Sequence, residues 1–494
     1  MKRLLPLFLL LAFVLPACGT PLSDFTEAAP SFDTLTIAYA EPISNYSPFT
    51  YNATNRKYLS HLYEPLVRFD GTFNMDSALA VSWGRLDDTT WDFQLRQGVY
   101  FHTGAAFDAQ DVLYSLSLAK TAGDSELGAL LSTISNVEIT NDHRIKIVTS
   151  RPDPLLLNKL TYVFIVPDAY ESFDLPVGTG PYRVSAFSDD TLSLERFESY
   201  WGAVGYFPKV SLSYVPDLEE RNAGFLDGSY HVLANVPPQY VQTYRDANYN
   251  LVDFPSLEVS YLMMSRDGIF ADSNLRMAVW FALSTDYAES FGGGFLQNTS
   301  QFAATGIFGY DGDASARDQN LELAQHFRDM IPGSVVVTLD VPQGLGVLGE
   351  AIAQDLSEVD IQVMVNELSA SELDDKIQAS QSDFYFFGWK YDLADSADFF
   401  EAVVHSKNES FGQFNGLDYA DFNLDTLIED ASTTLSVEDR RALLTAISDR
   451  LLDDKSIVPL FESKNLYGLQ PGLYWNLRLD GQLWASEIVE SVVE

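Results

Sequence analysis

The chain has 494 residues, of which 46% are hydrophobic and 20% charged, so it must bury large cores and is neither a disordered tail nor a disulfide-stapled miniprotein. Seventy acidic residues against 30 basic ones give a formal net charge of -40. Phosphate backbones need Lys and Arg to displace their counterions, so this balance argues against nucleic-acid binding. The simplest interpretation of the acidity is a solvated, mutually repelling surface.

The N-terminal segment has the pattern of an export signal. Lys2 and Arg3 precede an apolar run that ends at Cys18, the only cysteine of the chain. The run is too short for a membrane-spanning helix of about 20 residues, so it predicts a signal peptide over residues 1–17. Its last four residues resemble a bacterial lipobox, in which Cys18 would become the lipidated first residue. Residues 18–30, rich in small, Pro and hydroxyl side chains, are expected to form a tether.

The next informative region predicts a small sheet with a helix. Apolar and polar residues alternate strictly over Trp91–Arg96, which is typical of a half-buried strand, and Gln97 and Gly98 then turn the chain. Asp108 is placed to cap a helix that ends at Lys120, where the positive charge suits the helix dipole.

Between residues 334 and 392 the pattern is strand, helix, strand, helix, strand. The predicted strands are Val335–Leu339, Ile361–Val365 and Phe384–Phe387, and the predicted helices are Glu350–Leu356 and Ser371–Ala379. Such alternation implies a parallel sheet, whose ligands bind beyond the carboxyl ends of the strands. Gly388–Asp392 is expected to occupy that position. Further along, Ser436 begins a long amphipathic helix that runs through Leu451.

No pattern of catalytic or metal-binding residues stands out. The six histidines are dispersed, with no pair at the i, i+4 spacing that puts two imidazoles on one helix face. The chain has no G-x-S-x-G elbow, Walker A loop or H-E-x-x-H motif. We therefore expect a protein that is not an enzyme and that has no catalytic residue, no metal and no cofactor.

Several segments, taken in order, resemble a known family. They are YEPLVRFDG (63–71), WDFQLRQGVYFHTGAAFDAQDVLYSL (91–116), VGTGPYRV (177–184), FESYWG (197–202), LRMAVWFAL (275–283), GWKYDLADSADFF (388–400) and RRALLTAISDRLLDDKSIVPLF (440–461). These segments are similar to the bacterial extracellular solute-binding proteins of family 5, the oligopeptide-, dipeptide- and nickel-binding components of ABC importers.

The resemblance implies an α/β fold of the periplasmic-binding-protein type, class II or cluster C, with two lobes joined by a hinge and an additional small domain. By the family layout, residues 31–63, 169–262 and 462–494 form lobe I. Residues 64–168 form the small domain, and residues 263–461 form lobe II.

The resemblance also suggests ligand-binding residues. In peptide-binding relatives an Asp three residues after a Trp binds the ligand's α-ammonium group, and Trp389 and Asp392 match that pattern. A partly desolvated carboxylate suits this role, with a solvated or helix-capping loop acid as the alternative. Trp389 and Tyr391 are expected to line the ligand or, alternatively, to pack in the core. Glu41 and Asn45 follow the first predicted strand, where residues of lobe I can approach the ligand.

The expectation is a monomeric lipoprotein, anchored through Cys18 at the outer face of the cytoplasmic membrane or in the periplasm. It would capture a short peptide by hinge closure and deliver it to an ABC permease and its ATPase, without contact with nucleic acid. The alternatives are the same fold binding a nickel chelate, an oligosaccharide or an opine-like compound, an exported hydrolase, or a sensory or chaperone-like surface protein.

Overall fold

The computed structural model describes residues 32–121, 125–168, 170, 172–314, 316–476 and 478–490. The predicted signal peptide, Cys18 and the tether lie outside these residues. Within the part of the chain that is described, no helix has both the length and the apolar character needed to cross a membrane.

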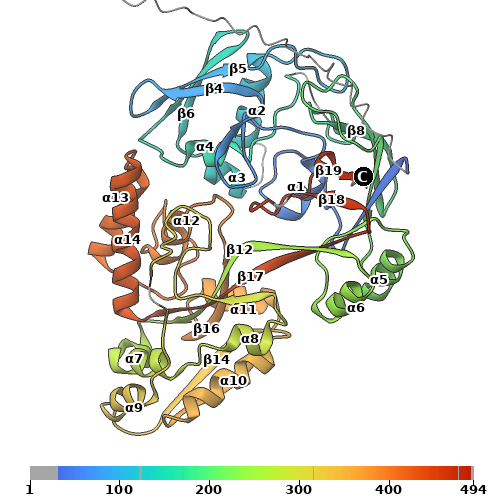
Figure 1. The fold of residues 1–494 in the computed structure, drawn as a ribbon. Helices are drawn as coiled ribbons and strands as arrows, with labels where there is room; N and C mark the ends of the chain where they lie inside the picture. The colour runs from blue at the N-terminus through green and yellow to red at the C-terminus, as the bar shows by residue number, and fades with distance from the viewer. Residues whose placement is uncertain are drawn as a thin grey trace, which may run out of the picture.

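Two long strands, β12 (Asn250–Met264) and β17 (Ile457–Leu469), run through the middle of the molecule and pair with each other (Figure 1). They belong to an 11-stranded sheet of the described residues. On one side of the pair follow β16 (Phe384–Lys390), β14 (Val335–Pro342) and β15 (Ile361–Leu368). On the other side follow β11 (Val232–Leu233), β1 (Thr34–Tyr39), β10 (Lys209–Tyr214), β9 (Thr191–Arg196) and β8 (Tyr182–Phe187), and β13 (Leu296–Asn298) pairs with β17.

The sheet thus has two parts, each with its own helices. We call the part with β1 and β8 to β11 lobe I, which carries α1 (Ala53–Leu59), α5 (Leu218–Leu226) and α6 (Val241–Asp246). The part with β14 to β16 is lobe II. Its helices are α7 (Ser273–Ala282), α8 (Tyr287–Phe291), α9 (Leu321–Asp329), α10 (Gly346–Ser357), α11 (Ala370–Gln378), α12 (Ala397–Phe399), α13 (Phe422–Thr433) and α14 (Val437–Asp454), with a π-helical turn over Phe400–Val404.

The alternating strands and helices predicted in lobe II are confirmed. β14 and β15 are parallel over their whole length, and β14 also runs parallel to β16 at Asp340 and Tyr385. α11 begins with a capping box in which Ser369 and Glu372 bond each other's backbone N–H groups. All three strands end later than predicted, β14 at Pro342, β15 at Leu368 and β16 at Lys390. β16 is extended because Glu258–Met264 of β12 pair with it along its whole length.

A separate four-stranded sheet forms the small domain, in the order β4 (Ala80–Arg85), β5 (Thr90–Leu95), β7 (Arg144–Thr149) and β6 (Ile134–Asn141). Its helices are α2 (Ala109–Thr121), α3 (Ser125–Leu130) and α4 (Leu156–Leu160). The predicted strand and helix are confirmed here as β5 and α2. The Asp108 carboxylate accepts a hydrogen bond from the Gln110 N–H at 2.7 Å, which caps α2 as the sequence predicted.

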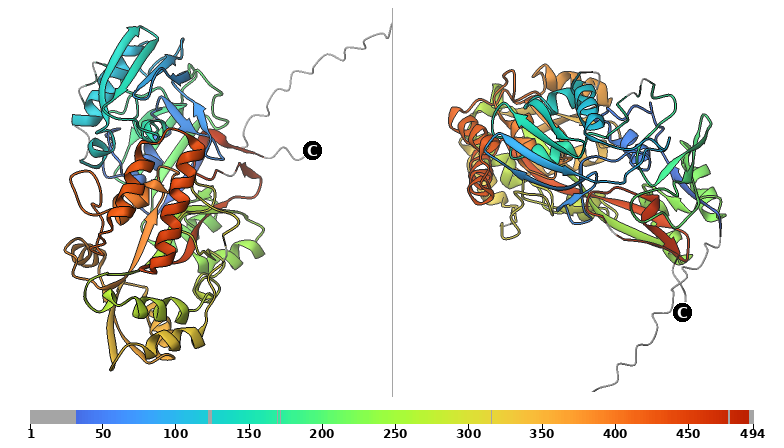
Figure 2. Two further views of the ribbon diagram at one scale, coloured as in Figure 1. Left: turned by 90° about the vertical axis from the view of Figure 1, so that its left-hand side faces the viewer. Right: turned by 90° about the horizontal axis from the view of Figure 1, so that it is seen from above.

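Shorter elements complete the described chain. They are the pairs β2 (Val67–Phe69) with β3 (Met75–Ser77) and β18 (Leu473–Trp475) with β19 (Ile488–Glu490), and the 3-10 turns Pro238–Tyr240, Gly268–Ala271 and Ala485–Glu487. Figure 1 and the left view of Figure 2 place the small-domain sheet at one end of the molecule and α9 and α10 at the other. The strands β12 and β17 lie between these ends.

The two lobes meet at an irregular point of β12. The ladder between β12 and β17 shifts register between Pro255 and Val259, and Leu257 in this bulge has a positive φ of 65°. A non-glycine residue in the left-handed region is strained, and such residues persist where the surrounding structure holds them. The bulge coincides with the position where β12 begins to pair with β16 of lobe II, so the join between the lobes is a locally bent part of the sheet.

Candidate ligand-binding site

A pocket lies where lobe I, the small domain, lobe II and the C-terminal segment come together. It has a volume of about 920 Å³, counting the space on its open side. We call it the interlobe pocket. It is lined by Arg56 of α1, by Glu64 and by Tyr162 and Phe164, which follow α4. It is also lined by Leu257 in the bulge of β12, by Lys390 and Asp392 at the end of β16, and by Trp484 near the C-terminus.

Asp392 is a partly exposed carboxylate in this pocket. It lies two residues beyond the end of β16, with 21% of its side chain exposed. The Nζ atom of Lys390 lies 2.8 Å from its Oδ1 atom. The backbone carbonyl of Asp392 accepts a hydrogen bond from the Tyr162 hydroxyl at 2.9 Å. Asp392 is thus held in place by the small domain while its carboxylate remains accessible.

Arg56 of α1 provides a second positive charge near Asp392. Its guanidinium donates to the carbonyls of Thr161 at 2.9 Å and Tyr162 at 3.1 Å, and it stacks over the rings of Tyr162 and Phe164. Burial lowers the pKa of Arg56, and the negative charge of Asp392 is among the interactions that offset this. The contacts fix a cation at the junction of lobe I and the small domain.

Trp389 lies on β16, three residues before Asp392, and is not among the residues that line the interlobe pocket. Its half-buried indole stacks on Phe387 and meets the edges of Phe399 and Phe414, with ring centroids 5.7 to 6.2 Å apart. Next to it, burial raises the pKa of Asp398 well above its ordinary value, and the charge of Asp392 adds to the rise. The protonated form of Asp398 is therefore favoured, which reduces its repulsion of Asp392.

Tyr391 was expected from the sequence to contact the ligand, but its side chain lies in the core. Its side chain is completely buried, and its hydroxyl is 2.6 Å from the Tyr261 hydroxyl and also bonds the carbonyl of Phe302. The side chain packs in the core because successive side chains of an extended chain point to opposite faces, which places Tyr391 on the side away from Lys390 and Asp392. The alternative of core packing is the one that this geometry supports.

Glu41 and Asn45 occupy different surroundings in the loop after β1. Glu41 accepts a hydrogen bond from Thr54 at 2.6 Å and lies 3.8 Å from Lys57 Nζ. Burial lowers the pKa of Lys57, Glu41 offsets part of this, and the positive charge of Lys390 adds to the lowering. Glu41 and Lys57 in lobe I therefore lie across from Lys390 in lobe II. Asn45 is exposed and accepts from the Ser47 N–H at 3.0 Å, which gives it a local role in the loop.

The small domain also contacts the loop after β16 directly. The Asn158 side chain donates to the Leu393 carbonyl at 2.7 Å, beside the bond from Tyr162 to Asp392. Arg151 donates to the Ser432 hydroxyl at 2.9 Å. These bonds join the small domain to lobe II.

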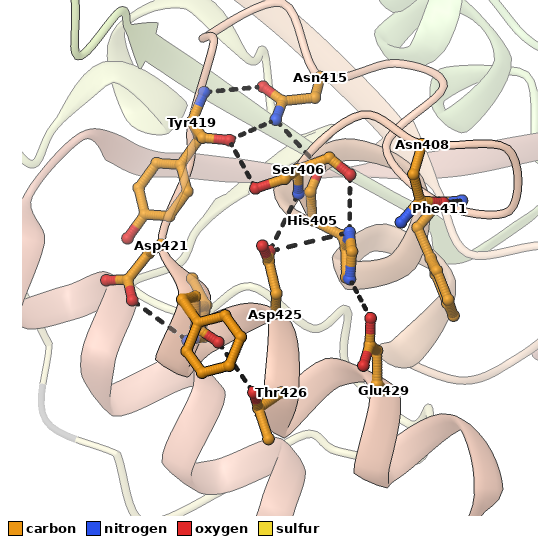
Figure 3. A network of polar contacts seen from close by, with 12 residues as sticks. His405, Ser406, Asn408, Phe411, Asn415, Tyr419, Asp421, Asp425, Thr426 and Glu429 are labelled. Carbon is orange, nitrogen blue, oxygen red and sulfur yellow. Dashed lines mark hydrogen bonds and ion pairs between the residues drawn. The ribbon is translucent and has the colours of Figure 1, made fainter.

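A polar network around His405 and Asn415 holds the chain between residues 405 and 419 (Figure 3). His405, 2% exposed, bonds the carbonyl of Ser406 at 2.7 Å and lies 3.3 Å from Glu429. The Asn415 amide donates to the carbonyls of His405 and Tyr419. The network lies next to Phe414, whose ring meets the edge of Trp389.

One edge of β16 is open near the pocket. β14 pairs with β16 only through Asp340 and Tyr385, so the residues from Phe386 to Lys390 have no strand partner on that side among the described residues. Unpaired N–H and C=O groups of a strand can bind an extended chain.

Arg56, Tyr162, Lys57 and Lys390 were not predicted as site residues. Lys390 lies inside the Trp389–Asp392 motif, so a positive charge next to Asp392 could have been predicted from the sequence. Arg56 and Tyr162 are 106 residues apart and meet only through the tertiary fold. Within the described residues, no group of three or more His, Cys, Asp or Glu side chains could hold a metal ion.

Two α/β lobes joined through a bent sheet, an added small domain and a pocket between them define a solute-binding protein of the periplasmic type. The family model of the bacterial extracellular solute-binding proteins, family 5 (middle region), matches residues 74–330, more than half of the chain. The chain therefore belongs to this family, and the fold expected from the resemblance is confirmed.

Individual relatives agree with the family. A Pseudomonas aeruginosa protein named "Probable di/tripeptide-binding protein 5" is 26% identical over 482 residues, which cover 87% of each chain. The structure is similar to that of HbpA2 from Haemophilus parasuis, with a TM-score of 0.84 and 18% identity over 93% of this chain and 100% of that one. It is also similar to the periplasmic binding protein DppA from Helicobacter pylori in complex with the peptide STSA, with a TM-score of 0.74 and 20% identity over 92% of this chain and 98% of that one.

Proposed function

We propose that this protein captures short peptides and that the Asp392 carboxylate binds their α-ammonium group. The observation that carries the proposal is the position of Asp392, partly exposed in the interlobe pocket at the end of a strand with an open edge. A carboxylate in such a place makes charge-assisted hydrogen bonds to an amine, which become stronger when water is excluded.

The open edge of β16 supports a peptide as the ligand. An extended peptide can bond its main chain to the residues from Phe386 to Lys390, while its amino terminus reaches Asp392. A side chain of the peptide could then contact the half-buried indole of Trp389 on the same strand, and Glu41 lies on the opposite side in lobe I. The names of the Pseudomonas and Helicobacter relatives agree with a peptide ligand.

Capture would proceed by closure of the lobes. The bodies that move are lobe I (31–63, 169–262 and 462–494) with the small domain (64–168), and lobe II (263–461), around the bulge of β12. An ABC permease with its ATPase would then receive the peptide from the closed form. The protein would perform no chemistry on the peptide, and it would be exported and held at the membrane by a lipid on Cys18.

The ammonium role is tested by isothermal titration calorimetry of short peptides with free and N-acetylated amino termini. A hydrogen bond to a charged group contributes about 1.5–3 kcal/mol, so acetylation or Asp392→Asn should weaken binding about 10- to 100-fold. Asp92→Asn is a matched control, because Asp92 forms a 2.8 Å ion pair with Arg144 in the small domain and its side chain is 16% exposed.

Equal binding of free and acetylated peptides would contradict the role of Asp392. Nickel chelates and oligosaccharides belong in the same titrations. Binding of one of these, with no response to any peptide, would replace the peptide proposal with another solute of the same fold.

A further inference from the structure

The Asp392 carboxylate already has a positive partner within the protein. Lys390 lies two residues before it, and its ammonium group is 2.8 Å from Asp392 Oδ1. The Lys390 side chain is 39% exposed, so it is accessible from the pocket. An ammonium group of a ligand that binds Asp392 must displace Lys390 or share the carboxylate with it.

One further cation lies near Asp392, and another lies near Lys390. Arg56 interacts electrostatically with Asp392 and is fixed by its bonds to Thr161 and Tyr162. Lys57 lies within the electrostatic reach of Lys390 from the side of lobe I. A ligand ammonium would thus meet the positive charges of Lys390 and Arg56 at the Asp392 carboxylate. The acids Asp398 and Glu258 lie in the same surroundings, but burial raises the pKa of each and disfavours its charged form. Like charges in a closed, poorly hydrated cleft are unfavourable.

If a ligand ammonium displaces Lys390 from Asp392, the neighbouring acid Glu258 is a weak replacement as its ion-pair partner. Glu258 is its neighbour on β12, directly across the ladder. The Glu258 carboxyl lies over Gly388, 2.7 Å from the position that a Cβ atom would take there. Burial raises the pKa of Glu258, Lys390 offsets part of this, and Asp392 adds to the rise. Its charged form is therefore disfavoured in the place where Lys390 would need it.

We infer that Lys390 selects peptides that carry a carboxylate next to their amino terminus, as Asp or Glu within the first two residues. The ligand ammonium binds Asp392, and the ligand carboxylate forms an ion pair with Lys390 in place of Asp392. This exchange leaves neither Asp392 nor Lys390 without a partner of opposite charge. The inference rests on the proposed function and adds the class of peptide.

The test is the affinity of four tripeptides with free amino termini, measured by calorimetry: Ala-Ala-Ala, Asp-Ala-Ala, Ala-Asp-Ala and Lys-Ala-Ala. We expect wild type to bind at least one of the Asp peptides at least tenfold more tightly than Ala-Ala-Ala, and Lys-Ala-Ala most weakly. Lys390→Met should reduce the preference for Asp to threefold or less, and Lys390→Arg should keep it. Lys146→Met, which removes a lysine from β7 of the small domain, should leave the preference unchanged.

Equal affinity of wild type for acidic and neutral peptides, or an undiminished preference in a folded Lys390→Met protein, would overturn the selection by Lys390. In either case a loss of binding on N-acetylation would still support the role of Asp392. If acetylated and free peptides bind alike, the proposed function and this inference fail together.

Discussion

The bonds between the small domain and the loop after β16 predict that the small domain holds the closed form. Tyr162 donates to the carbonyl of Asp392, and Asn158 donates to the carbonyl of Leu393. Opening of the lobes would separate these groups. The double variant Tyr162→Phe and Asn158→Leu removes both donors but keeps the ring on which Arg56 stacks.

The magnitude follows from the number of bonds. A neutral hydrogen bond contributes about 0.5–1.5 kcal/mol, so the loss of both costs the closed form about 1–3 kcal/mol. This corresponds to a shift of about 5- to 150-fold in the closure equilibrium. Where the open form predominates without ligand, the apparent Kd rises by the same factor.

Calorimetry of peptide binding measures the change in Kd. Small-angle X-ray scattering with and without peptide measures the change in the closure equilibrium. We expect weaker binding and a larger radius of gyration at a subsaturating peptide concentration. Tyr114→Phe is the control, because the Tyr114 hydroxyl donates to the carbonyl of Tyr170 at 2.8 Å, outside lobe II. A double variant with the affinity and scattering of wild type would refute the role of these bonds.

Three further predictions concern stability. Asp395→Ala leaves Arg440 buried without its bidentate partner, whose N–O distances are 2.5 and 2.9 Å, and should lower the free energy of unfolding in urea by about 3–5 kcal/mol. Burial lowers the pKa of His61 to about 4, so the unfolded chain binds the proton more readily than the folded chain. The free energy of unfolding should therefore fall by about 3 kcal/mol as the pH drops from 6.5 to 4. In urea titrations, His61→Gln should lack this pH-dependent loss of stability. The raised pKa of Asp398 disfavours its charged form, so Asp398→Asn should raise the Tm at pH 8 and lose this advantage near pH 4, and an equal Tm at pH 8 would contradict the assignment.

The sequence was most informative where local patterns coincide with the fold. The apolar patterns of Val335–Leu339, Ser371–Ala379 and Phe384–Phe387 predicted the parallel unit of lobe II, since each element there has its own periodicity. The extension of β16 to Lys390 could not be predicted in this way, because pairing with β12 maintains a strand that Gly388 and Lys390 would not favour alone.

The site was less predictable than the fold. The Trp389–Asp392 motif led to the pocket, but not to the side of the chain on which each residue lies. Tyr391 is buried by contacts with Tyr261 and Phe302, which are 130 and 89 positions away. Local sequence patterns carry no information about such distant partners, so the face that an aromatic residue presents at a strand end is decided by tertiary packing.

The open edge of β16 has a consequence for the protein without its ligand. Unpaired strand edges are templates on which a second chain can add its own strand, which leads to aggregation. Charged residues near such an edge oppose this, and lysine is among those that natural sheets use. Lys390 at the end of β16 would disfavour pairing with a strand of a second copy, and the net charge of -40 would repel that copy. Lys390, which lines the pocket, would thus also oppose aggregation of the protein without its ligand.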